Sequence, residues 1–240
     1  MSTPNPFRTL SGIALVVLAW AGALPPASLA AQESARQRAE QTLPADVYRE
    51  LVELASVSEA SGVPPEPLFN KALEGAAKRV PSERLLPAVR AYADRLGQAR
   101  GALGPGAGIP LLVAGADALQ RGVPADALRS LPADRPRSPV SLLVLAELME
   151  SGVPADRAIA MLRRAMDLRL QDDRMLDIPV RVRRLIRDGV PPAEAMDRVQ
   201  RLLRRNRGGS LGSLLPAGDT PIADRNLLRD RLRDRLRPGG

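Results

Sequence analysis

Apolar residues recur along most of this chain with the three-to-four-residue spacing of an α-helix, and they rarely alternate as they would in a β-strand. The run from 138 to 151 is apolar on nearly every side, which is typical of a helix packed on several sides. Narrower apolar stripes consist of Ile159, Leu162, Met166 and Leu170; of Val182, Leu185 and Ile186; of Ala195, Met196, Val199, Leu202 and Leu203; of Val47, Leu51 and Leu54; and of Leu68, Ala72 and Leu73. The pattern predicts a series of helices.

A short phrase separates these segments: Val or Leu, then Pro, then any residue, then an acid. It begins at Leu43, Val63, Val80, Val123, Leu131 and Val153, with a looser copy at Val190, and Gly precedes Val at Gly62, Gly122, Gly152 and Gly189. Gly adopts the left-handed conformation that ends a helix, Pro suits the first turn of the next helix, and an acid is favourable there. Val is expected to pack across the junction. The phrase therefore predicts a helix end followed at once by a helix start.

Helical hairpins joined by such turns predict an all-α fold of irregular hairpin repeats, either an α-solenoid-like stack or a compact helical bundle. The Gly-Val-Pro copies lie 60, 30 and 37 residues apart, which is looser than a strict repeat family allows. Composition agrees with helices, because Ala and Leu dominate the apolar residues and aromatic residues make up only 2%. The pattern resembles helical-repeat architecture in general and no particular family.

Two Gly-rich stretches suggest boundaries along the chain. Residues 101–109 are expected to link a front helical group, 31–100, to a rear group, 110–207. Residues 208–240 are expected to form a flexible segment that ends in a short basic amphipathic helix, with Leu228, Leu232 and Leu236 on one side. That helix could dock on a partner or a membrane surface, fold back on the chain, or stay frayed.

Residues 1–30 have the order of a secretory signal peptide. Arg8 precedes an apolar run from Leu10 to Leu24, and small residues, Ser28 and Ala30, stand before the expected cleavage point. We expect cleavage after Ala30, a periplasmic or secreted protein, and no transmembrane span after cleavage; a retained anchor is the alternative. The chain has no Cys, so an exported form must be stable through packing alone.

The net charge of +8 is unevenly distributed. Residues 31–156 carry a net charge of −2, whereas residues 157–207 contain 14 Arg and carry +7. This Arg-rich segment is open to two interpretations, solvated helix faces or a site for an anionic partner such as lipid or polymer. Nucleic acid is the least favoured partner, because no aromatic residue for base stacking lies in this segment. The candidate contacts, which recur at helical spacing, are Arg184, Arg187, Arg198, Arg201 and Arg205.

Catalytic chemistry has few residues to use. The chain contains neither His nor Cys, so we expect no metal site, no cofactor and no His-dependent catalysis. Ser210 lies in a Gly-x-Ser-x-Gly stretch, but the strand, helix and His base of a nucleophile elbow are missing. Asp172 and Asp173, near Asp177, could serve a hydrolase or calcium; we favour the interpretation that they begin a helix.

These observations favour an exported, non-enzymatic, all-helical protein that binds or scaffolds other proteins in the cell envelope. The alternative is an envelope protein that binds anionic lipid or polymer through residues 157–207. A hydrolase that relies on carboxylates alone is the third and least supported option.

Overall fold

The structure is a computed structural model that describes residues 34–132, 138–205, 226–228 and 230. Every element in these ranges is helical and none of them contains a strand, which confirms the predicted all-α class. The described residues belong to one compact unit. The predicted signal peptide, Ser210, Leu232 and Leu236 lie outside the described residues.

Eleven helices of four residues or more lie in the described ranges. In chain order they are α1 (Ala35–Thr42), α2 (Ala45–Ala60), α3 (Glu66–Ala77), α4 (Ser82–Leu103), α5 (Ile109–Gln120), α6 (Ala125–Arg129), α7 (Pro139–Glu150), α8 (Ala155–Asp167), α9 (Asp172–Met175), α10 (Asp177–Arg187) and α11 (Pro192–Arg205).

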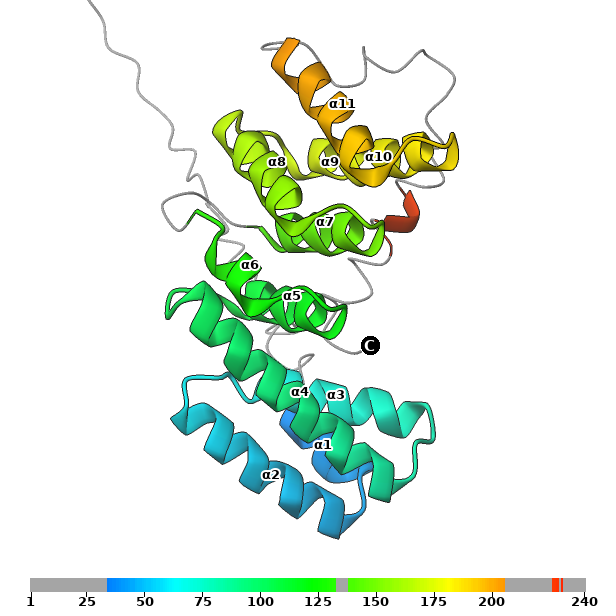
Figure 1. Ribbon diagram of the computed structural model, residues 1–240. Coiled ribbons are helices and arrows are strands. Elements are labelled where there is room, and N and C mark those ends of the chain that lie inside the picture. The colour runs from blue at the N-terminus through cyan, green and yellow to red at the C-terminus, as the bar shows by residue number, and fades with distance from the viewer. Residues whose placement is uncertain (1–33, 133–137, 206–225, 229, 231–240) are drawn as a thin grey trace, which may run out of the picture. The chain divides into compact units, whose positions relative to one another are not determined.

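The first four helices pack together, and the longest of them is α4. Helices α2 and α3 both contact α4, and α1 packs on α3 (Figure 1). The approach of α3 to α4 is close, since a Cβ atom added at Gly75 would overlap Cδ1 of Leu85. Helix α1 begins with a capping box, in which the Ser34 and Gln37 side chains accept from each other's backbone N–H groups.

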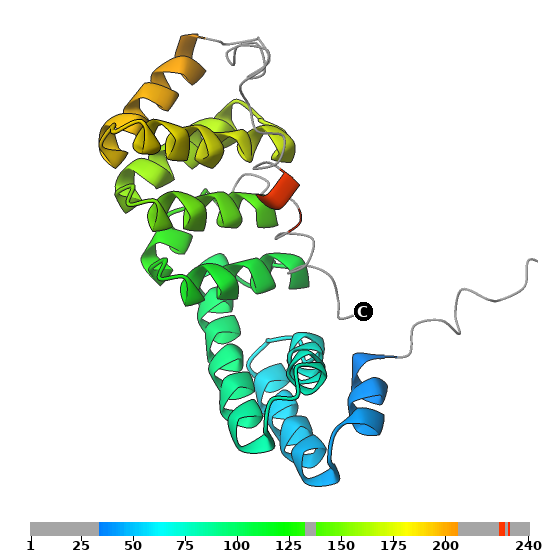
Figure 2. The ribbon, with the colours of Figure 1, turned by 90° about the vertical axis from the view of Figure 1, so that its right-hand side faces the viewer.

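Beyond α4, three pairs of helices follow one another along the chain: α5 then α6, α7 then α8, and α10 then α11, with the short helix α9 between α8 and α10. Helix α6 packs mainly on α4, whereas α7 packs on α8 and α10 on α11. The first members of the pairs contact one another in order, α5 against α7 and α7 against α10. The second members do the same, α6 against α8 and α8 against α11. Figure 1 and Figure 2 show α5, α7 and α10 as successive layers.

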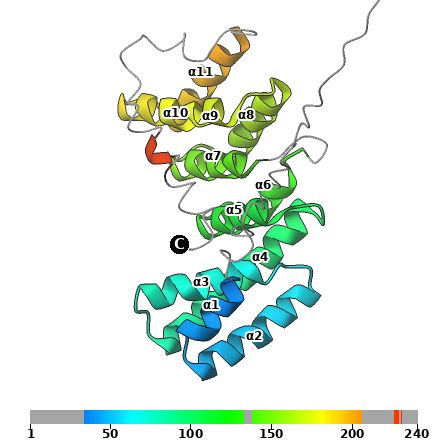
Figure 3. The same cartoon turned by 180° about the vertical axis from the view of Figure 1, so that it is seen from behind.

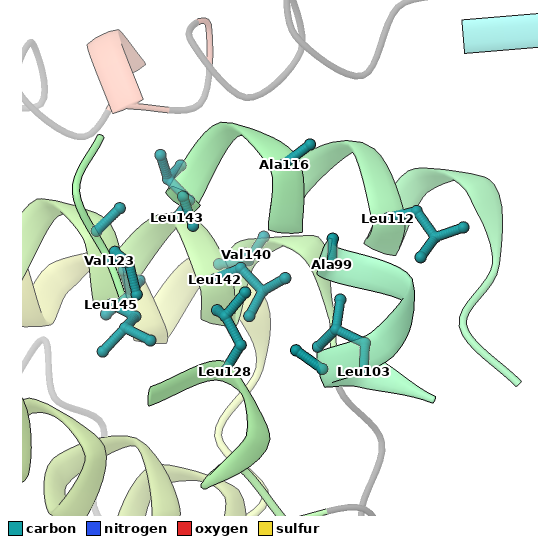
Figure 4. Close-up of a cluster of buried hydrophobic side chains, with 14 of the residues drawn as sticks. Ala99, Leu103, Leu112, Ala116, Val123, Leu128, Val140, Leu142, Leu143 and Leu145 are labelled. Atoms are coloured by element: carbon teal, nitrogen blue, oxygen red, sulfur yellow. The ribbon is translucent and has the colours of Figure 1, made fainter. Parts of the chain in front are cut away.

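A continuous apolar core joins these layers. Figure 4 shows the part of it where α4, α5, α6 and α7 meet. Helix α4 supplies Ala99 and Leu103; α5 supplies Leu112 and Ala116; α6 supplies Leu128; and α7 supplies Val140, Leu142, Leu143 and Leu145, all of them buried. The same core cluster includes residues from α1 through α11, so one apolar cluster runs through all the helices described above.

The turns predicted from the Gly-Val-Pro phrase are confirmed, and we call each of them an elbow. Gly62, Gly122, Gly152 and Gly189 have φ values of +76°, +88°, +81° and +85°. In the third elbow the Gly152 N–H donates to the Met149 carbonyl (2.9 Å) and the Val153 N–H donates to the Leu148 carbonyl (3.1 Å). This is a Schellman motif, which satisfies the last carbonyls of the helix. Val153 is buried, as a fastener between the two helices should be.

Pro is placed one residue earlier than expected. We predicted Pro inside the first turn, but Pro154 is the N-cap of α8, with φ −57° and ψ 140°. The ring fixes φ and leaves ψ free, so Pro can take the extended ψ that an N-cap needs. Its carbonyl then accepts the Ala158 N–H at 3.0 Å. Asp156 still falls in the first turn of α8, as predicted.

The predicted linker is shorter than its composition suggests. Helix α4 continues to Leu103, so Gly97 and Gly101 lie inside it. Helix α5 begins at Ile109, which leaves residues 104–108 between the two helices. Helices α4 and α5 then pack against each other, and Gly115 of α5 faces Ala99 and Leu103. Glycines within the 97–110 stretch therefore belong partly to a helix and partly to a turn.

Two further elbows use Arg where the others use Gly. Arg79 and Arg169 have φ values of +55° and +51°, and they are the only described residues other than Gly with positive φ. The Val80 N–H donates to the Gly75 carbonyl (3.0 Å) and the Leu170 N–H donates to the Ala165 carbonyl (3.0 Å), as in the Gly elbows. These two turns repeat the same geometry without its usual residue.

Replacing Arg79 with Gly is expected to stabilise the protein by about 0.5–1 kcal/mol, because a left-handed conformation strains a residue that has a Cβ atom. Arg79 is exposed, so little packing is lost. Urea unfolding followed by circular dichroism measures the change. The matched control is Arg79→Ala, which removes the same charge and keeps the Cβ atom; equal stability of the two variants would contradict the strain.

Candidate functional site

The most concentrated polar chemistry in the described residues surrounds Glu147, a carboxylate in the otherwise apolar helix α7. Its side chain is only 2% exposed. Oε1 accepts a hydrogen bond from Nη2 of Arg121 (2.7 Å), and Oε2 accepts one from Nη1 of Arg183 (2.8 Å). Arg121 follows α5 and Arg183 lies in α10. One carboxylate therefore joins three successive layers.

Two more acids complete what we call the Glu147 network. Arg121 Nε donates to Glu150 (2.6 Å), and Nη1 of Arg121 lies 3.9 Å from Oδ2 of Asp117. Burial alone would lower the pKa of Arg121, but its hydrogen bonds to Glu150 and Glu147 and their negative charges outweigh burial, so that its pKa is raised. The guanidinium is charged at any relevant pH; its Nε and Nη2 have carboxylate acceptors, whereas its Nη1 is buried without a hydrogen-bond partner among the described residues.

The elbows explain why these residues meet. Arg121 directly precedes Gly122, Glu147 lies five residues before Gly152, and Arg183 lies six residues before Gly189. Each side chain is thus near the end of the first helix of its pair. Since α5, α7 and α10 stack and end in the same kind of turn, their last turns come together.

A second polar cluster lies between α3 and α4. Lys71 and Lys78, the only lysines in the chain, both donate to Glu74, and Lys71 Nζ lies 5.9 Å from the centre of the Tyr92 ring. These contacts lower the pKa of Glu74 against the opposing effect of burial, which is the largest single influence. Burial, with smaller contributions from nearby charges, raises the pKa of Tyr92 to about 12. Tyr92 is therefore a neutral phenol, with no tendency to act as a base near neutral pH.

The candidate arginines of α10 lie in its last turn. Arg184 is half-buried and Arg187 is exposed, and both take part in polar or electrostatic contacts. Arg181 lies one turn before Arg184, and its Nε is buried without a hydrogen-bond partner among the described residues. Burial and then the positive charge of Arg184 lower the pKa of Arg181. Positive charge is therefore concentrated in this part of α10.

The candidate arginines of α11 are on the side away from the core. Ala195, Met196 and Val199 are buried, whereas Arg198 and Arg201 are exposed. Arg198 pairs with Glu194 of the same helix at 2.7 Å. Arg205 is the last residue of α11, so it lies on the same helix as Arg198 and Arg201, but its side chain lies outside the described residues. The structure thus gives two separate groups, one on each helix.

Several arginines of the Arg-rich segment serve the fold itself. Arg157 pairs with Asp197, which ties α8 to α11. Arg163 donates to the Ser130 carbonyl at 2.6 Å, which ties α8 to the end of α6. Together with Arg183, these residues account for part of the charge excess between 157 and 207, and only the remainder is available to a partner.

The acids considered for catalysis have structural contacts. Asp172 and Asp173 form the first turn of α9, as predicted, and Asp172 accepts a hydrogen bond from Ser138, the N-cap residue of α7 (2.8 Å). Within the described ranges, no group of three or more Asp or Glu residues could hold a metal ion. Nor is any described helix both long and apolar enough to cross a membrane.

The Glu147 network was not predicted from the sequence, although the position of Glu147 in a mostly apolar run is a signal for it. Glu147 interrupts a run that is otherwise apolar on every side, and a carboxylate buried on such a helix needs a cationic partner. Its partners could not be named from the sequence, because they are 26 and 36 residues away along the chain. Comparisons of the chain with models of protein families, with curated proteins and with solved structures gave no match.

Proposed function

We propose that this chain is an exported, non-enzymatic binding or scaffolding protein of the cell envelope, built as an α-solenoid-like stack of helical pairs. The observation that carries the proposal is the stacking of three pairs, first helix on first helix and second on second, through elbows of one geometry. Stacks of this kind offer extended surfaces, which proteins commonly use to bind other macromolecules.

An internal likeness supports the repeat character. Ser61-Gly-Val-Pro and Ser151-Gly-Val-Pro each begin a helix, and in both cases an Arg elbow follows 17 residues after the Gly, at Arg79 and Arg169. Each Arg elbow leads to an acid, an Arg and two apolar residues, in Glu83–Leu86 and Asp173–Leu176. Similar segments at equal spacing, with equal turns, are what a loosely repeated helical unit would produce.

Export and binding can be tested separately. Expression in a secreting bacterial host should give a mature chain that begins at Ala31 in the periplasmic fraction, as read by mass spectrometry. The mature chain, immobilised, should then retain at least one envelope protein at both low and high salt. The control is a Gly115→Val chain, whose α4–α5 packing is disrupted; equal retention by both chains would contradict binding by the folded stack.

The non-enzymatic part of the proposal has its own test. Asp172 is hydrogen-bonded to Ser138 and begins a helix, so the two acids have a structural role. An Asp172→Asn and Asp173→Asn double variant should therefore bind partners as the parent chain does. A hydrolytic activity of the parent that this variant loses would overturn the proposal.

A second candidate is binding of anionic envelope lipid or polymer through the Arg-rich segment. It is favoured by Arg181 and Arg184 of α10, because burial and then the positive charge of Arg184 lower the pKa of Arg181. An anionic headgroup beside these two arginines would relieve their repulsion. Arg187 and Arg201 are exposed and extend the positive charge along α10 and α11.

Vesicle co-sedimentation tests this candidate. The parent should bind vesicles containing anionic phospholipid and not purely zwitterionic ones, with binding lost at high salt or on addition of a soluble polyanion. Changing Arg184, Arg187, Arg198 and Arg201 to Gln should weaken binding by about a hundredfold or more. The control changes four exposed arginines elsewhere, Arg49, Arg84, Arg90 and Arg129, to Gln; equal losses in both variants would show that net charge alone acts.

A further inference from the structure

Two segments of the chain, 90 residues apart, fold into the same series of helices. Helices α2 and α7 end 90 residues apart, at Ala60 and Glu150, and helices α3 and α8 end at the same separation. The left-handed residues of their elbows are also separated by 90 residues. Helix α2 therefore occupies, in the first segment, the position that α7 occupies in the second.

The two helices differ in what covers them. In α7, Leu143 and Ala146 are buried, and α5 packs against this helix. The equivalent residues of α2 are Glu53 and Ser56, and both are exposed. The main contacts of α2 are with α1, α3 and α4. Because the end layers of a helical stack need a polar outer side, α2 has the character of an end layer.

This end of the stack is acidic. The exposed charged residues of α2 are four acids and one Arg, namely Asp46, Arg49, Glu50, Glu53 and Glu59. Val57 lies one turn after Glu53 and is 67% exposed. The outer side of α2 therefore combines net negative charge with one exposed apolar side chain.

The opposite end of the stack is basic. Figure 1 and Figure 3 show α2 at one end of the described helices and α11 at the other. Arg198, Arg201 and Arg204 are all exposed on α11, at intervals of three residues. Glu194 is exposed as well and pairs with Arg198. The outer side of α11 therefore has net positive charge, opposite in sign to that of α2.

We infer that copies of this chain associate head to tail, with the acidic outer side of α2 in one copy against the basic outer side of α11 in the next. The two unlike ends attract each other, whereas two like ends repel. Because the two surfaces differ, the contact is heterologous: a pair of copies still has one acidic and one basic end, and further copies can add. The inference goes beyond the proposed function, since it requires neither export nor a different protein.

The exposure of these charges determines how the association should respond to salt. Exposed charges are screened within about 8 Å at physiological ionic strength, so the contact should be reversible and strongest at low salt. Association driven by exposed apolar surface would not weaken in this way. Salt dependence therefore distinguishes pairing of the two charged ends from apolar aggregation.

Sedimentation velocity of the purified chain provides the first test. At low salt, the average mass should rise with protein concentration and pass that of a dimer. Salt at about 0.5 M should weaken the association about tenfold or more. A chain that stays monomeric at low salt, or growth that stops at the dimer, overturns the inference, because a heterologous contact of this kind leaves ends open.

Charge reversal tests which surfaces meet. One variant carries Glu53→Lys and Glu59→Lys on α2, and the other carries Arg201→Glu and Arg204→Glu on α11. Each variant alone brings like charges together and should associate about a hundredfold more weakly than the parent. An equal mixture of the two should associate again, since the reversed end of one matches the reversed end of the other. A mixture that stays monomeric overturns the inference.

The matched control carries Asp126→Lys and Asp167→Lys. These exposed residues lie in α6 and α8, and the substitutions change the net charge as those on α2 do. The control should associate like the parent, and an equal loss would overturn the inference by showing that net charge alone acts. The α2 variant keeps the Arg-rich segment, so its binding to anionic vesicles should persist, which separates association of copies from lipid binding. If circular dichroism shows that the α2 variant has lost helix, Glu53→Gln with Glu59→Gln should weaken association without reversing the charge.

Discussion

Replacing Glu147 with Ala is expected to lower the free energy of unfolding by about 3 kcal/mol, the largest effect of any single charged residue described. Removing the carboxylate leaves Arg183 without this partner at the junction of α7 and α10, and takes one of two close acceptors from Arg121. The estimate is at the lower end of the range for buried pairs, because the Arg183 side chain is 34% exposed and can turn toward water. Urea unfolding monitored by circular dichroism measures the loss.

Glu150 provides the matched control for this prediction. Glu150 also pairs with Arg121, but its side chain is 46% exposed. Glu150→Ala should therefore lower the free energy of unfolding by less than about 1 kcal/mol. A double variant, Glu147→Leu with Arg183→Met, should recover much of the lost stability, since apolar replacement of a whole buried pair is often neutral. If Glu147→Ala and Glu150→Ala cost the same, the importance of the buried carboxylate is disproved.

Replacing Gly115 with Val should destabilise the protein by about 2–3 kcal/mol through overpacking. A Cβ atom at this position would lie 2.9 Å from Cδ1 of Leu103 and 3.0 Å from Cβ of Ala99. The Leu103 methyl group could rotate aside, but the Ala99 Cβ is fixed to the backbone of α4. Helices α4 and α5 would therefore have to separate at the place where the first four helices join the stacked pairs.

The corresponding change at Gly97 should have the opposite sign. Gly97 also lies inside a helix, and nothing is within 4 Å of the position its Cβ would take. Gly97→Ala should therefore stabilise the protein by up to about 1 kcal/mol through helix propensity, whereas Gly115→Ala should destabilise it despite the same gain. Melting temperatures of the two Ala variants decide the matter, and a rise in both would contradict the close contact of α4 with α5.

The turns could be predicted from the sequence because their causes are local. A Gly at positive φ, a Val that packs back and an acid in the next first turn are determined within about six residues. At Arg79 the Val80 copy of the phrase predicted the turn but not its left-handed residue, and the turn at Arg169 was not predicted. Arg gives no local signal for a left-handed conformation, because that conformation strains any residue with a Cβ atom.

The buried sides of the helices were predicted less well than their existence. For α8 we expected a stripe that includes Ile159 and Leu170, but both are only partly buried. The buried side also includes Ala158, Met161 and Ala165. Small residues allow α8 to approach its neighbours closely, and sequence reasoning that follows large side chains overlooks them.

The candidate arginines illustrate the same division between local and long-range information. Helical spacing correctly predicted that Arg184 and Arg187 share a helix and that Arg198 and Arg201 share another. It could not reveal that Arg183 is committed to Glu147, or that Arg157 is committed to Asp197, because those partners are set by tertiary packing. Whether the remaining arginines bind an anionic partner stays a prediction.

The single carboxylate shared by α5, α7 and α10 also determines how the protein should lose its structure. In a chain of stacked pairs, each interface usually has its own strength, and the ends open before the middle. Here two adjacent interfaces depend on one side chain, so that opening either of them weakens the other. Backbone amides of α5, α7 and α10 are therefore expected to exchange their hydrogens with solvent in a single cooperative step.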